Sequence, residues 1–250
     1  MMKVVSLKTC LLRNNIDYYY YDSVNSTMDE IKNNISSKKI DTLVRAGTQK
    51  NGRGRLGAKW ISPRCNIYCS FALKTTTTLN NQYIYNKLTS LSIKDSLEYI
   101  GMQDVKFKWP NDIFFEKKKI SGIIIENINL ENNNNFIVLG IGINFTSSPS
   151  LKKNKTTNIL RYTKDINIDN FFKIFVNYFF YNLKSYNSMK ISNINERFIN
   201  SLMYIKKKIR IKVDNKKILT GIFHGLNDDG SLILKQKNKF ISIYVGKILT

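Results

Sequence analysis

A short segment rich in glycine and arginine constrains this chain more than its other features: Gly52-Arg53-Gly54-Arg55-Leu56-Gly57-Ala58-Lys59-Trp60. Its glycines disfavour a helix or strand interior and predict a loop whose backbone approaches a ligand closely. They also satisfy G-x-G-x-x-G. However, Pro63 and a strand-like run follow in place of a helix, so a dinucleotide-binding fold is not expected. The competing interpretation of the segment is a plain surface turn.

The arginines of this segment predict an anionic ligand. Arg53 and Arg55 supply planar donors that hold phosphate or carboxylate groups through paired hydrogen bonds. No Asp or Glu occurs between Asp41 and Asp95, so an anion bound there meets little repulsion from carboxylates. Arginine is scarce in this lysine-rich chain. Its clustering is therefore harder to ascribe to codon bias than the net charge of +22.

Three further motifs follow along the chain. Lys108-Trp109-Pro110-Asn111-Asp112 combines an aromatic surface, a stiff proline and opposite charges. Lys119-Ile120-Ser121-Gly122 brings a lysine and a glycine into a strand-like run, and Gly140-Ile141-Gly142-Ile143-Asn144 places two glycines in an apolar strand. Glycine inside a strand indicates that a ligand or another backbone packs closely. Taken alone, the first motif is equally a strand end with a structural Trp, and Lys119 is equally an exposed edge lysine.

Apolar periodicity and turn signals predict the secondary structure. Short elements are expected at 4–12 and 18–21, strands at 43–46, 67–73, 105–109, 119–126 and 136–144, and helices beginning near Ser26, at 84–100 and at 171–186. Thr27 and Glu30 have the spacing of a capping box, which predicts a helix start. Turns are expected at Asn111-Asp112 and at 132–135, and a polar loop is expected at 146–158.

From about Tyr204 the pattern changes to short strand candidates at 205–213, 218–226, 231–235 and 240–245. Short strands at this spacing predict a small β-barrel. A unit of fewer than about 50 residues is marginal alone, so we expect it to pack on the first domain. The fold class predicted is α+β, with a larger domain over residues 1–203 and a small β-domain over residues 204–250.

Composition narrows the classes of function. No stretch approaches the roughly 18 uncharged apolar residues of a membrane span, and the N-terminus lacks the pattern of a secretory signal. The three cysteines show no repeated spacing and there is one histidine, which argues against a disulfide framework and a zinc site. We therefore expect a cytoplasmic protein that has no protein-bound metal and does not bind a membrane.

Together, in this order and spacing, the four motifs resemble the biotin–protein ligase family. That family carries G-R-G-R-x-G-R-x-W, then K-W-P-N-D, K-x-x-G-I-L and G-x-G-I-N. The resemblance is close over about residues 23–144. It implies that the first domain is a catalytic domain built on a mixed sheet and that the C-terminal β-domain is an SH3-like barrel. It also implies formation of biotinyl-5'-AMP from biotin and ATP with Mg²⁺. The biotinyl group then passes to a lysine of a biotin carboxyl carrier protein of acetyl-CoA carboxylase or of another biotin-dependent carboxylase.

The resemblance also implies roles for particular residues. Those implied to hold biotin are Ser26, Thr27, Met28, Gln49, Arg53, Gly54, Arg55, Lys119 and Gly122. Those implied to hold ATP are Arg53, Arg55, Trp60, Asn111 and Asn144. Those implied to serve the reaction are Lys119, Arg55, Asp112 and Lys108, with Asp112 orienting the acceptor lysine or taking its proton. The chain departs from the family pattern at Ala58, where an arginine is usual, and at Met28, where asparagine is common. Ser26 and Thr27 also suit a purely structural helix cap.

Some members of that family carry an N-terminal helix-turn-helix and repress transcription. This chain reaches Ser26-Thr27 too early to hold one, so we expect a ligase-only form that does not bind DNA. A homodimer formed through exposed strands is compatible with the sequence. Two alternatives remain open. One is a lipoate–protein ligase, which shares the fold and reaction but would lack the glycine–arginine loop. The other is a basic nucleic-acid-binding protein, whose affinity would fall steeply with salt.

Overall fold

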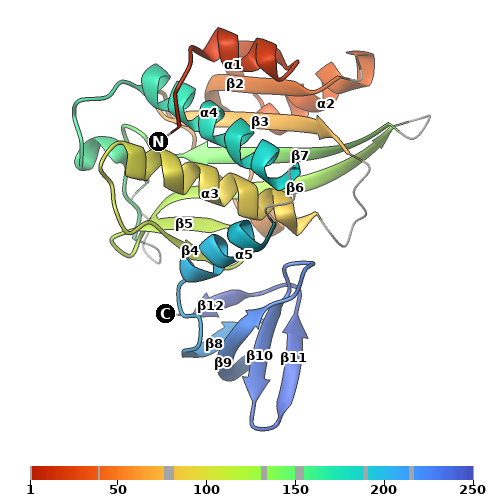
Figure 1. Ribbon diagram of the computed structural model, residues 1–250, viewed down its shortest axis with the longest axis vertical. Coiled ribbons are helices and arrows are strands. Elements are labelled where there is room, and N and C mark those ends of the chain that lie inside the picture. Colours follow the sequence, from red (N-terminus) through yellow and green to blue (C-terminus); the bar gives the residue numbers. More distant parts are fainter. Residues whose placement is uncertain are drawn as a thin grey trace.

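The chain folds into two units, each built on a β-sheet (Figure 1). The computed structural model describes residues 2–38, 40–75, 82–130, 134–149, 155–187, 191–213 and 217–249. The seven strands of the larger sheet are, in spatial order, β1 (Asp17–Val24), β2 (Thr42–Gln49), β3 (Ile67–Lys74), β7 (Asn134–Ile143), β6 (Lys118–Leu130), β5 (Asp112–Phe115) and β4 (Lys106–Lys108). β1 and β2 are parallel and the remaining neighbours antiparallel, which confirms the predicted mixed sheet.

Helices cover the two faces of the larger sheet unequally. The face that carries most of them holds α1 (Leu7–Arg13), α3 (Tyr83–Tyr99), α4 (Ile168–Asn187) and α5 (Ile191–Asn200). The other face carries α2 (Thr27–Lys38), which contacts β2, β3 and β7. Two short 3-10 helices, η1 (Arg55–Gly57) and η3 (Ile159–Arg161), lie in connecting segments.

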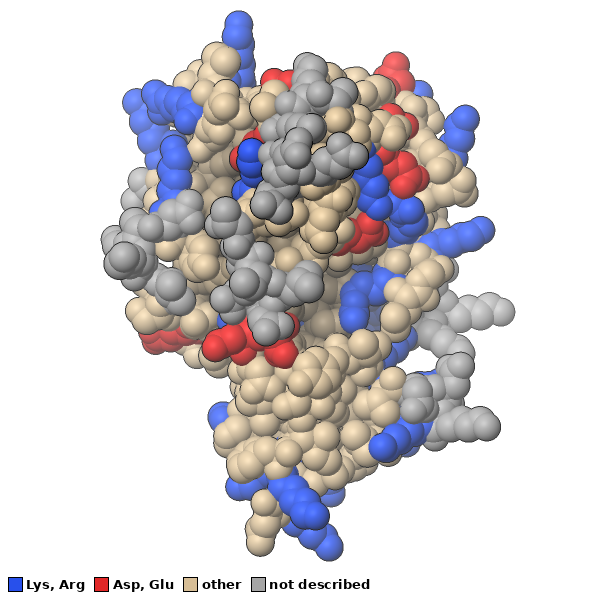
Figure 2. Space-filling view, turned by 90° about the vertical axis from the view of Figure 1, so that its right-hand side faces the viewer, with Lys and Arg blue, Asp and Glu red and all other residues tan. Residues whose placement is uncertain are grey.

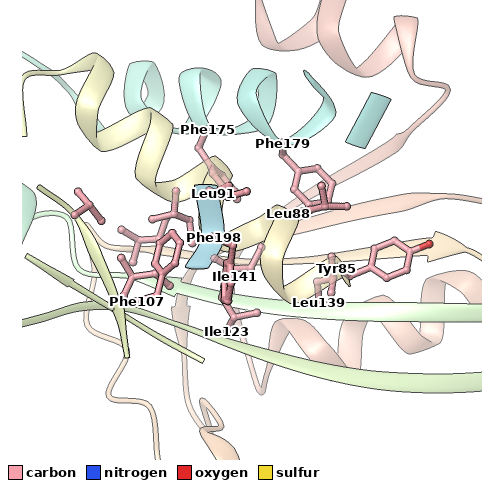
Figure 3. Packing of buried hydrophobic residues seen from close by; sticks show 14 of the residues in the cluster. Tyr85, Leu88, Leu91, Phe107, Ile123, Leu139, Ile141, Phe175, Phe179 and Phe198 are labelled. Atoms are coloured by element: carbon pink, nitrogen blue, oxygen red, sulfur yellow. The ribbon is translucent and has the colours of Figure 1, made fainter. Parts of the chain in front are cut away.

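The face beneath α3 and α4 contains the main hydrophobic core (Figure 3). Phe71 of β3 stacks on Phe179 of α4 with ring centroids 4.3 Å apart, and Phe175 meets the same ring edge-on at 6.2 Å. Leu88 and Leu91 of α3 are fully buried in this layer. Aromatic side chains bury large areas, so the aromatic-rich helix expected at 171–186 is a core helix, as predicted.

The start of α2 differs from the prediction. The backbone amide of Glu30 donates to the carbonyl of Ser26, and Ser26 Oγ accepts from the amide of Met28 at 3.3 Å. Ser26 is therefore the capping residue. The expected capping box of Thr27 and Glu30 is wrong, because the Thr27 hydroxyl donates to Gln49 instead.

Several other elements differ from the sequence prediction. The segment expected at 4–12 contains α1, and the turn expected at Asn111-Asp112 ends where β5 begins at Asp112. The sequence prediction missed β5 and α5. Of the expected turn at 132–135 and loop at 146–158, residues 132–133 and 150–154 lie outside the described residues, while 134–135 belong to β7.

The C-terminal unit is a five-stranded antiparallel sheet. Its strands, in spatial order, are β11 (Lys239–Ile243), β10 (Leu232–Gln236), β9 (Ile218–Leu226), β8 (Lys208–Lys212) and β12 (Lys247–Leu249). The four predicted strands are present, and β12 was missed because it has only three residues. Over the described residues no pairing joins β11 to β12, so the expected small barrel is an open five-stranded sheet.

The two units pack together around Trp109 and Gly230. The buried Trp109 indole donates its Nε1 hydrogen to the carbonyl of Gly230 at 2.8 Å. The ring of Tyr83 lies so close to Gly230 that a side chain there would overlap it, and the Tyr83 hydroxyl donates to the carbonyl of Pro110 at 3.2 Å. These contacts fix the second unit beside the 108–112 segment. Among the described helices, none combines the length and apolar character needed to cross a membrane.

Candidate functional site

A cavity of about 250 Å³ opens on the α2 face of the larger sheet, next to the C-terminal unit. Glycines of β6 and β7 leave room for it. A Cβ at Gly140 would lie 2.6 Å from Met28 Sδ, and one at Gly122 would lie 3.0 Å from the ring of Trp60. A Cβ at Gly142 would overlap the Trp60 indole. The glycines noted in the sequence therefore permit close approach, although the groups that approach them are the side chains of Met28 and Trp60 and not another backbone.

The glycine–arginine segment forms one wall of this cavity and folds back on itself. Arg53 and Lys59 form an isolated antiparallel bridge, and the amide of Trp60 donates to the carbonyl of Gly52 at 2.9 Å. The turn between them needs left-handed backbone at Leu56, with φ 53°, and at Gly57, with φ 74°. The segment is therefore a compact hairpin-like loop that lays Trp60 across the glycines of β6 and β7.

A polar cluster from three elements also borders the cavity. The Thr27 amide and hydroxyl donate to Gln49 Oε1 at 3.0 and 3.2 Å, and Gln49 Nε2 donates to Ser62 Oγ at 3.0 Å. Ser70 Oγ donates to Thr27 Oγ1 at 2.8 Å, within the buried part of the cluster. Ser26, Thr27 and Gln49 all line the cavity and therefore form one preorganised group of donors and acceptors.

Positive charge dominates the cavity lining. Its described residues include one carboxylate, that of Asp112, and the six cationic side chains of Arg53, Arg55, Lys59, Lys108, Lys119 and Lys247. Asp112 Oδ1 lies 2.6 Å from Lys119 Nζ, which also stands 5.1 Å from the centroid of the Trp60 ring. Arg53 pairs with Asp29 of α2 at 2.6 Å. Such an excess of cations favours an anionic ligand.

Burial changes the protonation equilibria of two of these cations. Burial lowers the pKa of Arg55, and the neighbouring Asp112 carboxylate opposes that shift. Burial also lowers the pKa of Lys108; Asp112 opposes it, while Lys247 and Lys119 lower it further. A bound anion would stabilise the charged form of both side chains.

Asn111 lines the cavity and is held in place by hydrogen bonds to β6 of the larger sheet. Its Nδ2 donates to the carbonyl of Ile123 at 2.6 Å, and the amide of Ile123 donates to the carbonyl of Asn111 at 3.0 Å. Trp109, its near neighbour, is buried at 3% exposure and joins the two units. Of the two interpretations of this motif, the structure therefore favours a structural Trp beside cavity-lining polar residues.

Asn144 is the one predicted site residue that the structure does not bring to the cavity lining. Its side chain is buried and donates to the carbonyl of Thr157 at 3.0 Å, and its amide donates to the carbonyl of Ile120. It fixes the segment that follows β7. Asn144 follows the last residue of β7, Ile143. Its side chain therefore contacts the segment around Thr157 and not the face of the sheet.

Sequence reasoning missed the contribution of the C-terminal unit. The cavity is also lined by Lys247 and Ile248 of β12 and by Gly246 just before it, far along the chain from the other motifs. No sequence signal pointed to them, because a three-residue strand after a glycine has no distinctive pattern. The cavity is thus built by both units.

Fold and site together define a two-unit α+β protein with a cationic, glycine-floored ligand cavity. The sequence matches the model of the biotin/lipoate A/B protein ligase family over residues 20–144, half of the chain, and the chain belongs to that family. A second match covers residues 204–249 and is described as the biotin protein ligase C terminal domain.

Individual relatives support this assignment. The chain is 30% identical over 146 residues to the bifunctional ligase/repressor BirA of Bacillus subtilis, covering 58% of this chain and 44% of that protein. It is 30% identical over 122 residues to the BirA of Escherichia coli, covering 48% and 38%. The chain thus spans less than half the length of these curated relatives. The structure of biotin protein ligase from Aquifex aeolicus in complex with biotin and ATP shares the fold, with a TM-score of 0.74, 24% identity and coverage of 93% and 97%.

Proposed function

We propose that this protein is an ATP-dependent biotin–protein ligase. It would join biotin to AMP and then transfer the biotinyl group to a lysine of an acceptor protein. The observation that carries this proposal is that one cavity is lined both by the polar group of Ser26, Thr27 and Gln49 and by Asp112 with the cations beside it, Lys119, Arg55 and Lys108. A ligand with a polar ring system, an apolar body and a terminal carboxylate suits this distribution.

The polar cluster suits the ureido ring of biotin. A ureido group carries both N–H donors and a carbonyl acceptor, and Thr27, Gln49 and Ser26 offer hydroxyl and amide groups that can match them. Met28 replaces a side chain that is polar in many relatives, so here it would give only apolar contact against the ring. Gly122 and the Trp60 indole would flank the aliphatic chain, since both border the cavity where the sheet lacks side chains.

The cations suit the first chemical step. A biotin carboxylate oxygen attacks the α-phosphorus of ATP, the bond from that phosphorus to the bridging oxygen breaks, and pyrophosphate leaves with the electron pair. Two anions must meet for this to happen, and Arg53, Arg55 and Lys119 would offset their repulsion. The backbone of Gly54 would approach the same oxygens. In this proposal Lys119 exchanges part of its pairing with Asp112 for the carboxylate of biotin.

The indole N–H of Trp60 is a hydrogen-bond donor that a ligand could satisfy. Its indole Nε1 is buried and has no hydrogen-bond partner among the residues that the structure describes. A buried donor without a partner is costly, so a ligand oxygen or ring nitrogen placed there would stabilise the complex. This supports a place for Trp60 beside the adenylate, with Asn111 nearby. Asn144 would act indirectly by holding the segment after β7.

The second step requires a neutral acceptor amine. The amine attacks the biotinyl carbonyl carbon, the bond to the AMP oxygen breaks, and a proton leaves the nitrogen. Asp112 is the carboxylate of the lining that is placed to orient the ammonium group or accept this proton. Lys108, Lys119 and Arg55 would lower the pKa of an approaching ammonium group by like-charge repulsion. The acceptor would be a biotin carboxyl carrier protein of acetyl-CoA carboxylase or of another biotin-dependent carboxylase.

Magnesium would arrive with the nucleotide. Among the described residues no group of three His, Cys, Asp or Glu side chains could hold a metal ion, and Asp112 is the only carboxylate of the described lining. Mg²⁺ commonly binds through substrate phosphates, waters and one or two carboxylates, so this donor set fits an ion carried by ATP. Its chemistry would be to shield the triphosphate charge.

The test is biotin-dependent adenylate formation. Purified protein is mixed with biotin, Mg²⁺ and α-labelled ATP, and biotinyl-AMP and pyrophosphate are measured, with lipoate in a parallel reaction. We expect product with biotin, and much less in an Arg55→Ala variant. Product with lipoate alone would transfer the assignment to a lipoate–protein ligase. No product with either acid would overturn the proposal and favour a nucleic-acid-binding protein instead. On the face shown in Figure 2, the Lys and Arg side chains of the described residues stand in separate groups, which does not favour that alternative.

A further inference from the structure

The C-terminal unit completes the active-site cavity. β12 pairs antiparallel with β8, and Ile248 is buried at 1% exposure, so this strand is fixed within its own sheet. The Trp109 to Gly230 hydrogen bond holds the sheet against the segment that carries Lys108 and Asp112. Lys247, which precedes Ile248, is exposed and lines the cavity. The second unit therefore places a cation in the site of the first.

Lys108 and Lys247 line the same cavity, one from each unit. Asp112 Oδ1 lies 2.6 Å from Lys119, and over the described residues neither Lys108 nor Lys247 forms a salt bridge. Lys108 Nζ is instead 5.7 Å from the ring centroid of Phe114 and 5.8 Å from that of Tyr204. Burial lowers the pKa of Lys108, Asp112 opposes that shift, and Lys247 and Lys119 lower the pKa further. Like charges held together in a partly buried site are destabilising until an anion lies between them.

The anion that suits this pair carries several charged oxygens. The carboxylate of biotin already has Lys119 and the loop arginines in the proposed function, which leaves Lys59, Lys108 and Lys247 of the lining cations for the phosphates. We propose that Lys247, acting with Lys108 from the other unit, binds the β- and γ-phosphates of ATP and holds pyrophosphate as it departs. This inference rests on the proposed function, because it assigns a residue to one substrate of that reaction. It gives the C-terminal unit a direct part in binding substrate.

Lys247 would contribute to the first chemical step, in which negative charge builds up on the departing pyrophosphate. When the α-phosphorus to oxygen bond breaks, its electron pair becomes additional negative charge on the pyrophosphate. An ammonium group already positioned near that oxygen stabilises it more strongly than it stabilises the intact triphosphate. Removal of Lys247 should therefore weaken phosphate binding and also slow adenylate formation at saturating ATP.

The experiment measures binding of inorganic pyrophosphate and of ATP with Mg²⁺ to the full chain by isothermal titration calorimetry. Variants are Lys247→Gln, Lys247→Arg and, as a matched control, Lys239→Gln on β11, the opposite edge of the same sheet. We expect Lys247→Gln to raise both Kd values by about 10- to 100-fold, as for loss of a charge-assisted hydrogen bond. The Kd for biotin should stay unchanged. Lys247→Arg should retain most of the affinity, and Lys239→Gln all of it.

The outcomes separate this inference from the proposed function. If wild-type protein forms biotinyl-AMP but Lys247→Gln binds pyrophosphate as tightly as wild type, the inference is overturned and the function stands. An equal loss of affinity for biotin and pyrophosphate would indicate a general disturbance of the cavity and would also overturn it. If the wild type binds neither biotin nor ATP, the proposed function fails first. Unchanged thermal unfolding of Lys247→Gln would exclude damage to the fold as the cause of a loss.

Discussion

The two faces of the larger sheet are built from the same strands, but one face forms the hydrophobic core and the other borders the ligand cavity. On β7, Leu139, Ile141 and Ile143 alternate with Gly140 and Gly142. The large residues belong to the core beneath α3 and α4, while the glycines lie under Met28 and Trp60 on the α2 face. Side chains of neighbouring residues in a strand point to opposite faces, so one strand supplies both patterns.

The difference shows how stability and binding are separated within a single layer. The core face is packed with aromatic and branched side chains from several elements and leaves little space. The other face has glycines at its centre, and the Trp60 indole fills part of the space that side chains would take there. Substitutions on the first face should therefore change the free energy of unfolding, and those on the second should change ligand affinity and rate.

The largest effect is expected on the core face. Phe71→Ala removes a fully buried ring from its contacts with Phe175, Phe179 and Phe180. We expect the free energy of unfolding to fall by about 3–5 kcal/mol, measured by urea denaturation. Biotin affinity of the remaining folded protein should change little. A loss below about 1 kcal/mol would break the comparison, since it would show that this face is not tightly packed.

On the cavity face, Lys119→Ala should act on the reaction and leave stability nearly unchanged. The side chain pairs with Asp112 and lies over Trp60, so its loss removes positive charge where the carboxylate is activated. We expect adenylate formation to slow by about 10²- to 10³-fold, the usual effect of deleting one preorganised donor. Lys118→Ala is the control, because its surface pair with Glu116 spans 3.6 Å and it does not line the cavity. Equal rates in the two variants would contradict the assignment.

Gly142→Ala tests whether the lack of a side chain is itself functional. The added methyl group would overlap the Trp60 indole and push it off the sheet. Overpacking of this kind costs about 1–3 kcal/mol, which we expect to appear as weaker biotin binding in a fluorescence titration. Gly225→Ala in the C-terminal sheet is the control, because its methyl group would meet only Ile233, at 3.9 Å. Tight biotin binding by Gly142→Ala would show that Trp60 need not lie on the sheet.

The smallest effect concerns thiol reactivity. Burial raises the pKa of Cys69, on the core face of β3, to about 12, and burial also raises that of Cys10. At pH 8 both thiols are therefore protonated and shielded, whereas Cys65 is exposed. Mass spectrometry after brief treatment with iodoacetamide should find Cys65 modified first, because the thiolate is the reacting form. Equal rates at all three positions would mean that the core face opens readily.

Sequence reasoning worked best where one short segment contains a whole part of the site. Arg53, Arg55 and Trp60 lie within a few residues of each other, and local glycines already fix the kind of loop they form. The cavity likewise gathers the predicted Lys108, Asp112 and Lys119. Most strands were also predicted, since alternation and apolar runs are local signals, whereas the mixed sheet was implied by the family resemblance.

It failed where placement depends on distant contacts. Ser26, and not Thr27, caps α2, because the Thr27 hydroxyl finds Gln49 on another strand. Asn144 turns toward Thr157 and away from the cavity. Lys247 enters the site only because the two units pack at Trp109 and Gly230. None of these outcomes has a signature in the neighbouring sequence, since each is decided by tertiary packing.

The chain contains only two tryptophans, and one lies between the two units while the other lies in the wall of the ligand cavity. Trp109 is held between the units by its hydrogen bond to Gly230, while the Trp60 indole lies on Gly142 in the cavity wall, with a buried Nε1 that has no hydrogen-bond partner among the described residues. The molecule therefore carries two built-in optical reporters. In a Trp109→Phe protein, the emission of Trp60 would follow ligand entry; in a Trp60→Phe protein, that of Trp109 would follow separation of the units. Rapid-mixing fluorescence on the pair would tell whether the units part before pyrophosphate leaves.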